Sequence, residues 1–150
     1  MLGWFEKHYK PISAIAALLT AFLALAALIG VKVQIDGAAR IQREQSARDI
    51  YREFLSLSVQ KPEFAAPDFC SLANSSQLPA YEAYVDYLLY TGEQVLSVDP
   101  EWQETIEVAL APHAAFLCDP KNTNNHPDPD VNALVIKLNA AQCQNIAPCN

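Results

Sequence analysis

Apolar residues are concentrated in one stretch near the amino terminus, between Lys10 and Lys32. Residues 11–31 carry no charge, and ten of the side chains from Ile12 to Val31 are Leu, Ile, Val or Phe. About 20 helical residues cross the roughly 30 Å hydrocarbon core of a bilayer. A cleaved secretory signal has a shorter apolar run, of about 7–15 residues. The pattern therefore predicts a transmembrane helix over residues 11–32, with residues 1–10 as an interfacial tail.

Residues 33–61 change to the pattern of a helix that crosses solvent. The stretch from Gln42 to Ser46 is polar all round, and an apolar stripe begins at Ala47 and continues through Phe54. Such a stripe, with apolar residues three and four apart, marks the side of a helix that faces a core. These residues predict a juxtamembrane helical stalk that leads into a soluble domain.

Residues 62–150 predict an acidic helical soluble domain. Pro79 and Asp99 each provide a helix-start signal, Pro112 interrupts an apolar helical stripe, and Asp130 is expected to cap a last short helix. No run of alternating β-branched residues is long enough to require a sheet. The predicted fold class is all-α, with a single N-terminal transmembrane helix continuing into the stalk and a small helical bundle.

Charge divides the chain and excludes one class of partner. Residues 1–61 hold eight Lys or Arg and five Asp or Glu, whereas residues 62–150 hold two Lys and twelve Asp or Glu. The distal part therefore repels phosphate backbones. We expect membrane lipid as a partner, a homo-oligomer, a second membrane protein as a further candidate partner, and no nucleic acid polymer.

A stripe of small residues runs along the predicted span. Its members are spaced by four, three, four and three residues: Ser13, Ala17, Thr20, Ala24 and Ala27. Small side chains let helix backbones approach closely in lipid, so the stripe predicts self-association of the span. The alternative interpretation is an alanine-rich span with no packing role.

The cysteines contain no C-x-x-C pair, which argues against a zinc site or a thioredoxin-type motif. They stand at Cys70, Cys118, Cys143 and Cys149. Two disulfides are one interpretation, with three pairings open. The other is that Cys70 and Cys118 are small core residues and the remaining two belong to a tail.

No residue pattern identifies catalytic chemistry, a metal site or a cofactor. His113 falls on an apolar helix face, which favours a hydrogen-bonded core histidine. A nucleophile pair of Cys70 or Cys118 with His113 stays open, because such partners meet in space rather than in sequence. The polar stretch from Asp119 to Asp130 lacks the ligand order of a calcium-binding EF-hand loop and predicts a solvated loop. We predict a non-enzymatic protein with no cofactor.

Basic residues gather behind the span, at Arg40, Arg43, Arg48 and Arg52. One interpretation is a salt-bridged stalk face near lipid headgroups. The other is an anion site, formed where several stalk helices converge, that senses a small ligand such as a cyclic nucleotide. The same residues and Lys32 outnumber the bases before the span, so the positive-inside rule favours a cytoplasmic soluble domain. A periplasmic, disulfide-stabilised domain is the alternative orientation.

The chain resembles a group of small bacterial membrane proteins that have one N-terminal span, an Arg- and Gln-rich juxtamembrane helix and a short helical domain. The residues that carry this resemblance read ARIQREQSARDIYREFLSLSVQKPEF, YEAYVDYLLYTGEQVL and DPEW. The resemblance implies a single-pass protein of the bacterial inner membrane and brings no assigned activity. Some membrane-anchored accessory proteins of bacterial antiviral systems share the layout and bind a cyclic oligonucleotide. We therefore predict a membrane-anchored protein that acts by self-association and partner contact.

Overall fold

The computed structural model describes the backbone of residues 2–122, 126–147 and 149, and the side chains of these residues from Leu18 onward. All regular elements in this described part are helices, so the all-α prediction is confirmed. The chain divides into two compact units, Met1–Gln42 and Arg43–Asn150.

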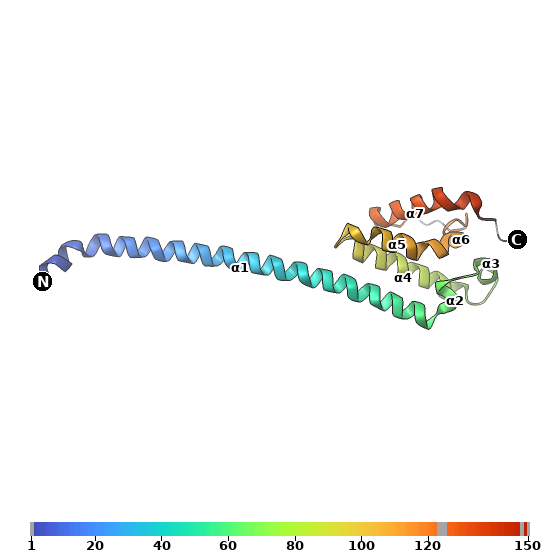
Figure 1. Ribbon diagram of the computed structural model, residues 1–150, viewed down its shortest axis with the longest axis horizontal. Coiled ribbons are helices and arrows are strands. Elements are labelled where there is room, and N and C mark those ends of the chain that lie inside the picture. Colours follow the sequence, from blue (N-terminus) through green and yellow to red (C-terminus); the bar gives the residue numbers. More distant parts are fainter. Residues whose placement is uncertain (1, 123–125, 148, 150) are drawn as a thin grey trace. The chain divides into compact units, whose positions relative to one another are not determined.

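Helix α1 (Leu2–Gln60) begins in the first unit and ends in the second (Figure 1). Among the described residues it alone is long and apolar enough to be a candidate membrane span. The apolar side chains of its segment from Leu18 to Ile35 are exposed, including Phe22 at 75% and Leu28 at 67%, and none of the most apolar window is buried. A contiguous apolar surface of this kind requires an apolar environment or partner. Within the described residues the structure thus contains one candidate membrane-spanning helix, and the part from Leu18 to Lys32 belongs to the span that the sequence predicts.

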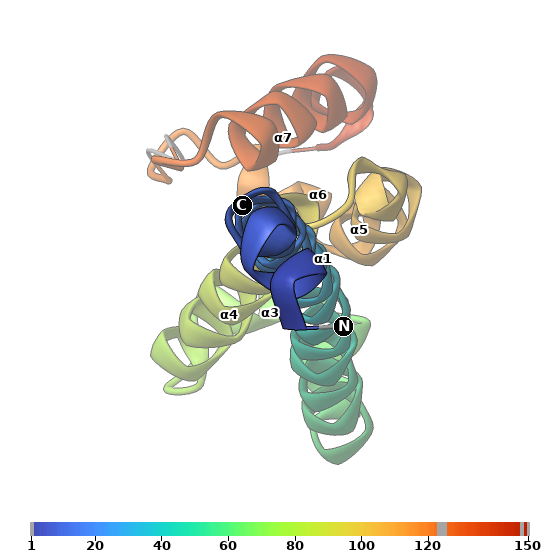
Figure 2. The ribbon, with the colours of Figure 1, turned by 90° about the vertical axis from the view of Figure 1, so that its left-hand side faces the viewer.

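The second unit is a small helical domain. Its elements after α1 are α2 (Pro62–Ala65), α3 (Phe69–Leu72), α4 (Leu78–Leu96), η1 (Pro100–Trp102), α5 (Gln103–Leu110), η2 (Ala111–His113), α6 (Ala114–Leu117), α7 (Pro129–Gln142) and η3 (Cys143–Asn145). In two perpendicular views α7 lies above α5 and α6, and α4 lies below them with the end of α1 (Figure 1 and Figure 2).

Capping residues and prolines set the helix boundaries of this unit. The Asp99 carboxylate accepts a hydrogen bond from the backbone N–H of Glu101 at 2.9 Å, where η1 begins. Pro112 separates α5 from α6 by the 3-10 turn η2, as expected of a residue without an N–H. The cap of α7 differs from the prediction. Asp128 caps that helix, accepting from the N–H groups of residues 130 and 131, because Pro129 takes the first helical position.

The core fills the space between α4, α5 and α7, with α1 packed against α4 by aromatic rings. Tyr81, Leu88, Ile106 and Val131 are fully buried. At Gly92 the helices approach so closely that an added Cβ would lie 3.2 Å from Cγ2 of Ile106. The core thus leaves no room for a side chain at this crossing.

The end of α1 belongs to this core. Ala47 and Phe54 are 2% and 4% exposed, and the second unit accordingly begins at Arg43. The sequence predicted a helical stalk over residues 33–61 with an apolar stripe from Ala47 that faces a core. The burial of Ala47 and Phe54 agrees with that stripe.

Candidate functional site

A groove of about 440 Å³ opens between the last turns of α1 and helix α5. Ten of its lining residues are Tyr51, Phe54, Leu55 and Ser58 of α1, Tyr84 of α4, Glu104, Thr105, Val108 and Ala109 of α5, and His113. Its volume lies within the roughly 300–1,000 Å³ range of binding sites for small ligands, and its lining is mainly apolar. The groove is therefore the candidate binding site of the helical domain.

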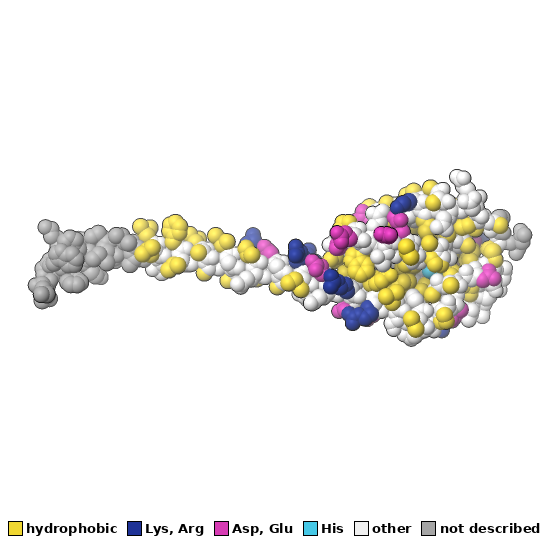
Figure 3. All heavy atoms as spheres, viewed as in Figure 1, with side chains coloured by type: hydrophobic (Ala, Val, Ile, Leu, Met, Phe, Trp, Pro, Cys, Tyr) yellow, Lys and Arg dark blue, Asp and Glu magenta, His cyan; other side chains and the backbone are white. Residues whose placement is uncertain are grey.

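The apolar rims of this groove are exposed. Of its lining residues, Leu55 of α1 is 45% exposed and Val108 of α5 is 68% exposed. Figure 3 shows hydrophobic side chains gathered on this face of the domain, over the end of α1 and over α5. A cluster of exposed aliphatic residues around a concave surface is typical of a contact site.

Hydroxyl groups on the groove wall are already paired with each other. Ser58 Oγ donates to the backbone carbonyl of Phe54 at 2.9 Å, and Ser58 Oγ and the Tyr84 hydroxyl lie 2.6 Å apart. Since serine has one hydroxyl proton, Tyr84 must be the donor in the second bond. Burial raises the pKa of Tyr84, so the phenol keeps that proton at neutral pH. The remaining lone pairs make this wall an acceptor of hydrogen bonds.

A buried histidine lies at the bottom of the groove. His113 is 1% exposed, and its Nδ1 lies 2.9 Å from the hydroxyl of the fully buried Tyr81. The rings of Tyr84 and Tyr81 lie against it, with centroids 5.6 Å and 5.8 Å away. Burial lowers the pKa of His113 to about 4, so the imidazole is neutral at neutral pH. The interpretation of His113 as a hydrogen-bonded core residue agrees with this geometry.

The groove contains a serine and a histidine, yet they do not form a nucleophile–base pair. Such pairs lie within hydrogen-bonding distance of each other. The Ser58 hydroxyl instead donates to the Phe54 carbonyl, and the Nδ1 of His113 is paired with Tyr81. An imidazole with a pKa of about 4 is also a weak base at neutral pH. This arrangement suits binding better than proton transfer.

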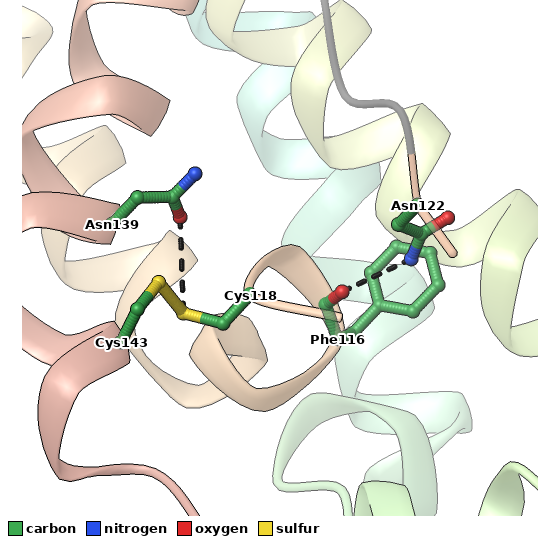
Figure 4. Close-up of a disulfide and its surroundings, with 5 residues drawn as sticks. All are labelled: Phe116, Cys118, Asn122, Asn139 and Cys143. Carbon is green, nitrogen blue, oxygen red and sulfur yellow. Dashed lines mark hydrogen bonds between the residues drawn. A yellow bond between two sulfur atoms is a disulfide. The ribbon is translucent and has the colours of Figure 1, made fainter. Parts of the chain in front are cut away.

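The four cysteines form two disulfides. Cys118, at the end of α6, is joined to Cys143, at the end of α7, with their Cα atoms 5.4 Å apart (Figure 4). Asn139 Oδ1 approaches Cys118 Sγ at 3.9 Å, and this is a contact without a hydrogen bond because a disulfide sulfur has no proton. Asn122 Nδ2 donates to the Phe116 carbonyl near the end of α6 at 3.0 Å.

The other disulfide joins Cys70 of α3 to Cys149, with Cα atoms 5.1 Å apart and a sequence separation of 79. It joins Cys149 to the short helix α3. Of the three pairings that the sequence left open, the structure has this nested one. With Cys70 and Cys118 both bonded, neither supplies a thiolate to pair with His113.

The four candidate arginines all lie on α1. Arg40 belongs to the first unit, and Arg43, Arg48 and Arg52 belong to the second. All are exposed, Arg40 interacts with neighbouring groups, and Arg52 forms an ion pair with the Asp49 carboxylate. The lining of the groove includes none of them.

The small-residue stripe is described only in part. Thr20, Ala24 and Ala27 are exposed on α1, whereas the side chains of Ser13 and Ala17 lie outside the described residues. No group of three or more His, Cys, Asp or Glu side chains with metal-binding geometry occurs within the part of the chain that the structure describes.

Sequence reasoning missed the groove and its exposed lining residues Leu55 and Val108. The available signal was that these aliphatic residues stand on helix faces that are otherwise polar. Comparison of the chain with protein-family models, with curated proteins and with solved structures finds no match. The functional argument therefore rests on the geometry of this chain alone.

Proposed function

We propose that this protein is a single-pass protein of the bacterial inner membrane whose helical domain acts without catalysis, by protein–protein contact through the groove. The supporting observation is that Leu55 and Val108, two exposed aliphatic residues, line a concave, mainly apolar surface. Soluble monomeric domains rarely expose such a surface without a contact role. The paired hydroxyl groups and the neutral histidine support binding over catalysis.

The proposal places the helical domain on the periplasmic side of the membrane. Two disulfides with ordinary Cα separations account for every cysteine. Disulfides persist in oxidising compartments and are rare in the cytosol, where thiol systems keep cysteines reduced. This argument favours the orientation opposite to the one that the positive-inside rule favours. We give it precedence because the disulfides account for all four cysteines, whereas Arg43, Arg48 and Arg52, which the rule counts, belong to the same compact unit as the helical domain.

Thiol trapping in intact cells tests the orientation. Cells that contain the full-length protein are denatured in the presence of a maleimide-coupled polymer and without reductant. The protein should then show no gel shift, because all four sulfurs are bonded. After reduction it should shift by four additions. Four additions without reduction would place the domain in the cytoplasm and contradict the proposal.

Photo-cross-linking tests the contact role. With the photo-reactive residue benzoylphenylalanine in place of Val108, illumination of cells should produce a cross-linked adduct, because this exposed side chain stands at the groove rim. The matched control is the same substitution at Tyr90, which is 49% exposed on α4 and lies outside the groove lining. Adduct at Tyr90 alone, or at neither position, would exclude a contact role for the groove.

A further inference from the structure

The two disulfides of the helical domain differ in their exposure to solvent. Cys70 and Cys149 are both exposed, whereas Cys118 and Cys143 are both half-buried. A disulfide is reduced by a thiolate that reaches one of its sulfur atoms, so access to the bonded cysteines governs how fast reduction begins. The Cys70–Cys149 bond is therefore the one that an external thiol reaches first.

A neighbouring amide adds to the protection of the half-buried bond. Asn139 Oδ1 lies 3.9 Å from Cys118 Sγ, between α7 and the end of α6 (Figure 4). This oxygen carries partial negative charge, which opposes the approach of an anionic thiolate. Among the described residues, no comparable side-chain contact is made by the sulfur atoms of Cys70 and Cys149.

The helix that carries Cys70 is held on the core independently of the disulfide. The preceding residue, Phe69, is 6% exposed. Its ring lies against those of Phe116 and Tyr81, with centroids 5.5 Å and 6.2 Å away. Helix α3 therefore keeps its place on the core whether or not Cys70 is bonded.

The segment that carries Cys149 has fewer attachments. The described residues after η3 are Ile146, Ala147 and Cys149, and we name these three residues the tail. Ile146 is partly buried against the core, but no hydrogen bond joins the tail to the rest of the described chain. The bond to Cys70 is thus the main attachment of the tail, and its reduction frees the tail while the helices stay packed.

We propose that the Cys70–Cys149 disulfide is a thiol–disulfide exchange site whose substrate is the dithiol of a thioredoxin-like oxidoreductase, and that the Cys118–Cys143 bond stays closed. One thiolate of the dithiol attacks a sulfur of the exposed bond, forms a mixed disulfide and releases the other cysteine as a thiolate. The second thiolate of the oxidoreductase then displaces the mixed disulfide. Two electrons pass to this protein, the dithiol becomes a disulfide, and its two protons end on Cys70 and Cys149.

A dithiol suits this site better than a single thiol. Its second sulfur is held beside the mixed disulfide at a high effective concentration, whereas a single thiol needs a second collision to complete the reduction. The inference does not rest on the contact role of the groove, because none of the four cysteines lines it.

Reduction of the full-length protein in detergent by reduced thioredoxin tests the assignment, because both bonds are compared in one folded molecule. Samples taken over time are blocked with N-ethylmaleimide, then denatured, fully reduced and labelled with iodoacetamide. Tandem mass spectrometry gives the blocked fraction at each cysteine. We expect Cys70 and Cys149 to be blocked about tenfold faster than Cys118 and Cys143. Equal rates, faster reduction of the half-buried bond, or no reaction with thioredoxin would overturn the inference.

Hydrogen–deuterium exchange of the same samples tests the release of the tail. Once the exposed bond is open, amide exchange over residues 143–149 should rise, whereas exchange over α4 should stay unchanged. The matched control is Cys70→Ser with Cys149→Ser, in which exchange over residues 143–149 should be high at the outset and thioredoxin should not alter it. Unchanged exchange in the reduced wild-type protein would show that the bond does not hold the tail, and a response of the control would show that the other bond is the substrate. Either result contradicts the proposal.

Discussion

Replacing Cys118 and Cys143 together with serine should lower the free energy of unfolding of the helical domain by about 3.5 kcal/mol. The loop that this disulfide closes spans 25 residues, and the estimate follows from the entropy that loop closure removes from the unfolded chain. The disulfide also joins the ends of α6 and α7, two elements with few turns of their own. Guanidinium denaturation of the full-length protein in detergent, followed by circular dichroism, measures the change.

Replacing Cys70 and Cys149 together with serine should lower the free energy of unfolding by about 4 kcal/mol. The span of 79 residues is shortened in the unfolded chain by the disulfide nested within it, so the two estimates lie close together. Reduction of both should leave the domain marginally stable at best, since ordinary domains are stable by about 5–15 kcal/mol. Denaturation midpoints that do not move in either serine variant would show that the cysteines do not hold this fold together.

Hydrophobic periodicity predicted the helices of the domain well, because the core residues of each helix recur at helical spacing within a short segment of sequence. Tyr81, Tyr84 and Leu88 are spaced by three and four residues on one side of α4, and all three are buried. The same holds for Ile106 and Leu110 of α5. Each of these residues is placed by spacings of three and four within one helix, which the sequence displays directly.

Features that depend on packing between distant segments were not predictable in the same way. Cys70 and Cys149 meet because the carboxyl-terminal segment returns to α3, and no spacing rule contains that path. The Tyr81 hydroxyl and His113 are 32 residues apart, so the sequence could place His113 in a core without naming its partner. The groove lies between α1 and α5. Its width depends on how α1 packs against α4, for example through the rings of Phe54 and Tyr84.

The choice between Asp128 and Asp130 as the cap of α7 illustrates a local error. Both precede an apolar stripe, and both are good capping residues. Pro129 decides between them, because proline is favoured at the first helical position and makes the preceding residue the cap. The proline was visible in the sequence, so a closer application of the same rule would have found the observed cap.

Lowering the pH from 7 to 4 should destabilise the helical domain through His113. Burial lowers the pKa of this residue from 6.5 to about 4 in the folded protein, whereas the unfolded chain returns it to its ordinary value. Between these values the unfolded state binds a proton that the folded state does not. His113 therefore does not lower the free energy of unfolding above pH 6.5. As the pH falls towards 4, protonation of this residue in the unfolded chain lowers the free energy of unfolding by about 3 kcal/mol in all.

The variant His113→Gln should remove this part of the pH dependence, because glutamine does not titrate and its amide can still pair with the Tyr81 hydroxyl. Tyr81 and Tyr84 also face His113, but burial raises the pKa of both phenols, so neither titrates in this range. Glu104 lines the groove as well, and together with the other carboxylates it remains in every variant. The difference between the wild-type and variant curves therefore isolates the histidine.

Tyr81→Phe provides the matched control for that experiment. It removes the partner of His113 Nδ1 and should lower stability by about 1–3 kcal/mol at neutral pH, the cost of a buried polar group without a hydrogen bond. Because the histidine stays buried, the loss of stability between pH 6.5 and 4 should persist in this variant. Denaturant unfolding at a series of pH values gives all three curves. If the wild-type protein and His113→Gln lose stability in parallel as the pH falls, His113 is not held neutral by the fold.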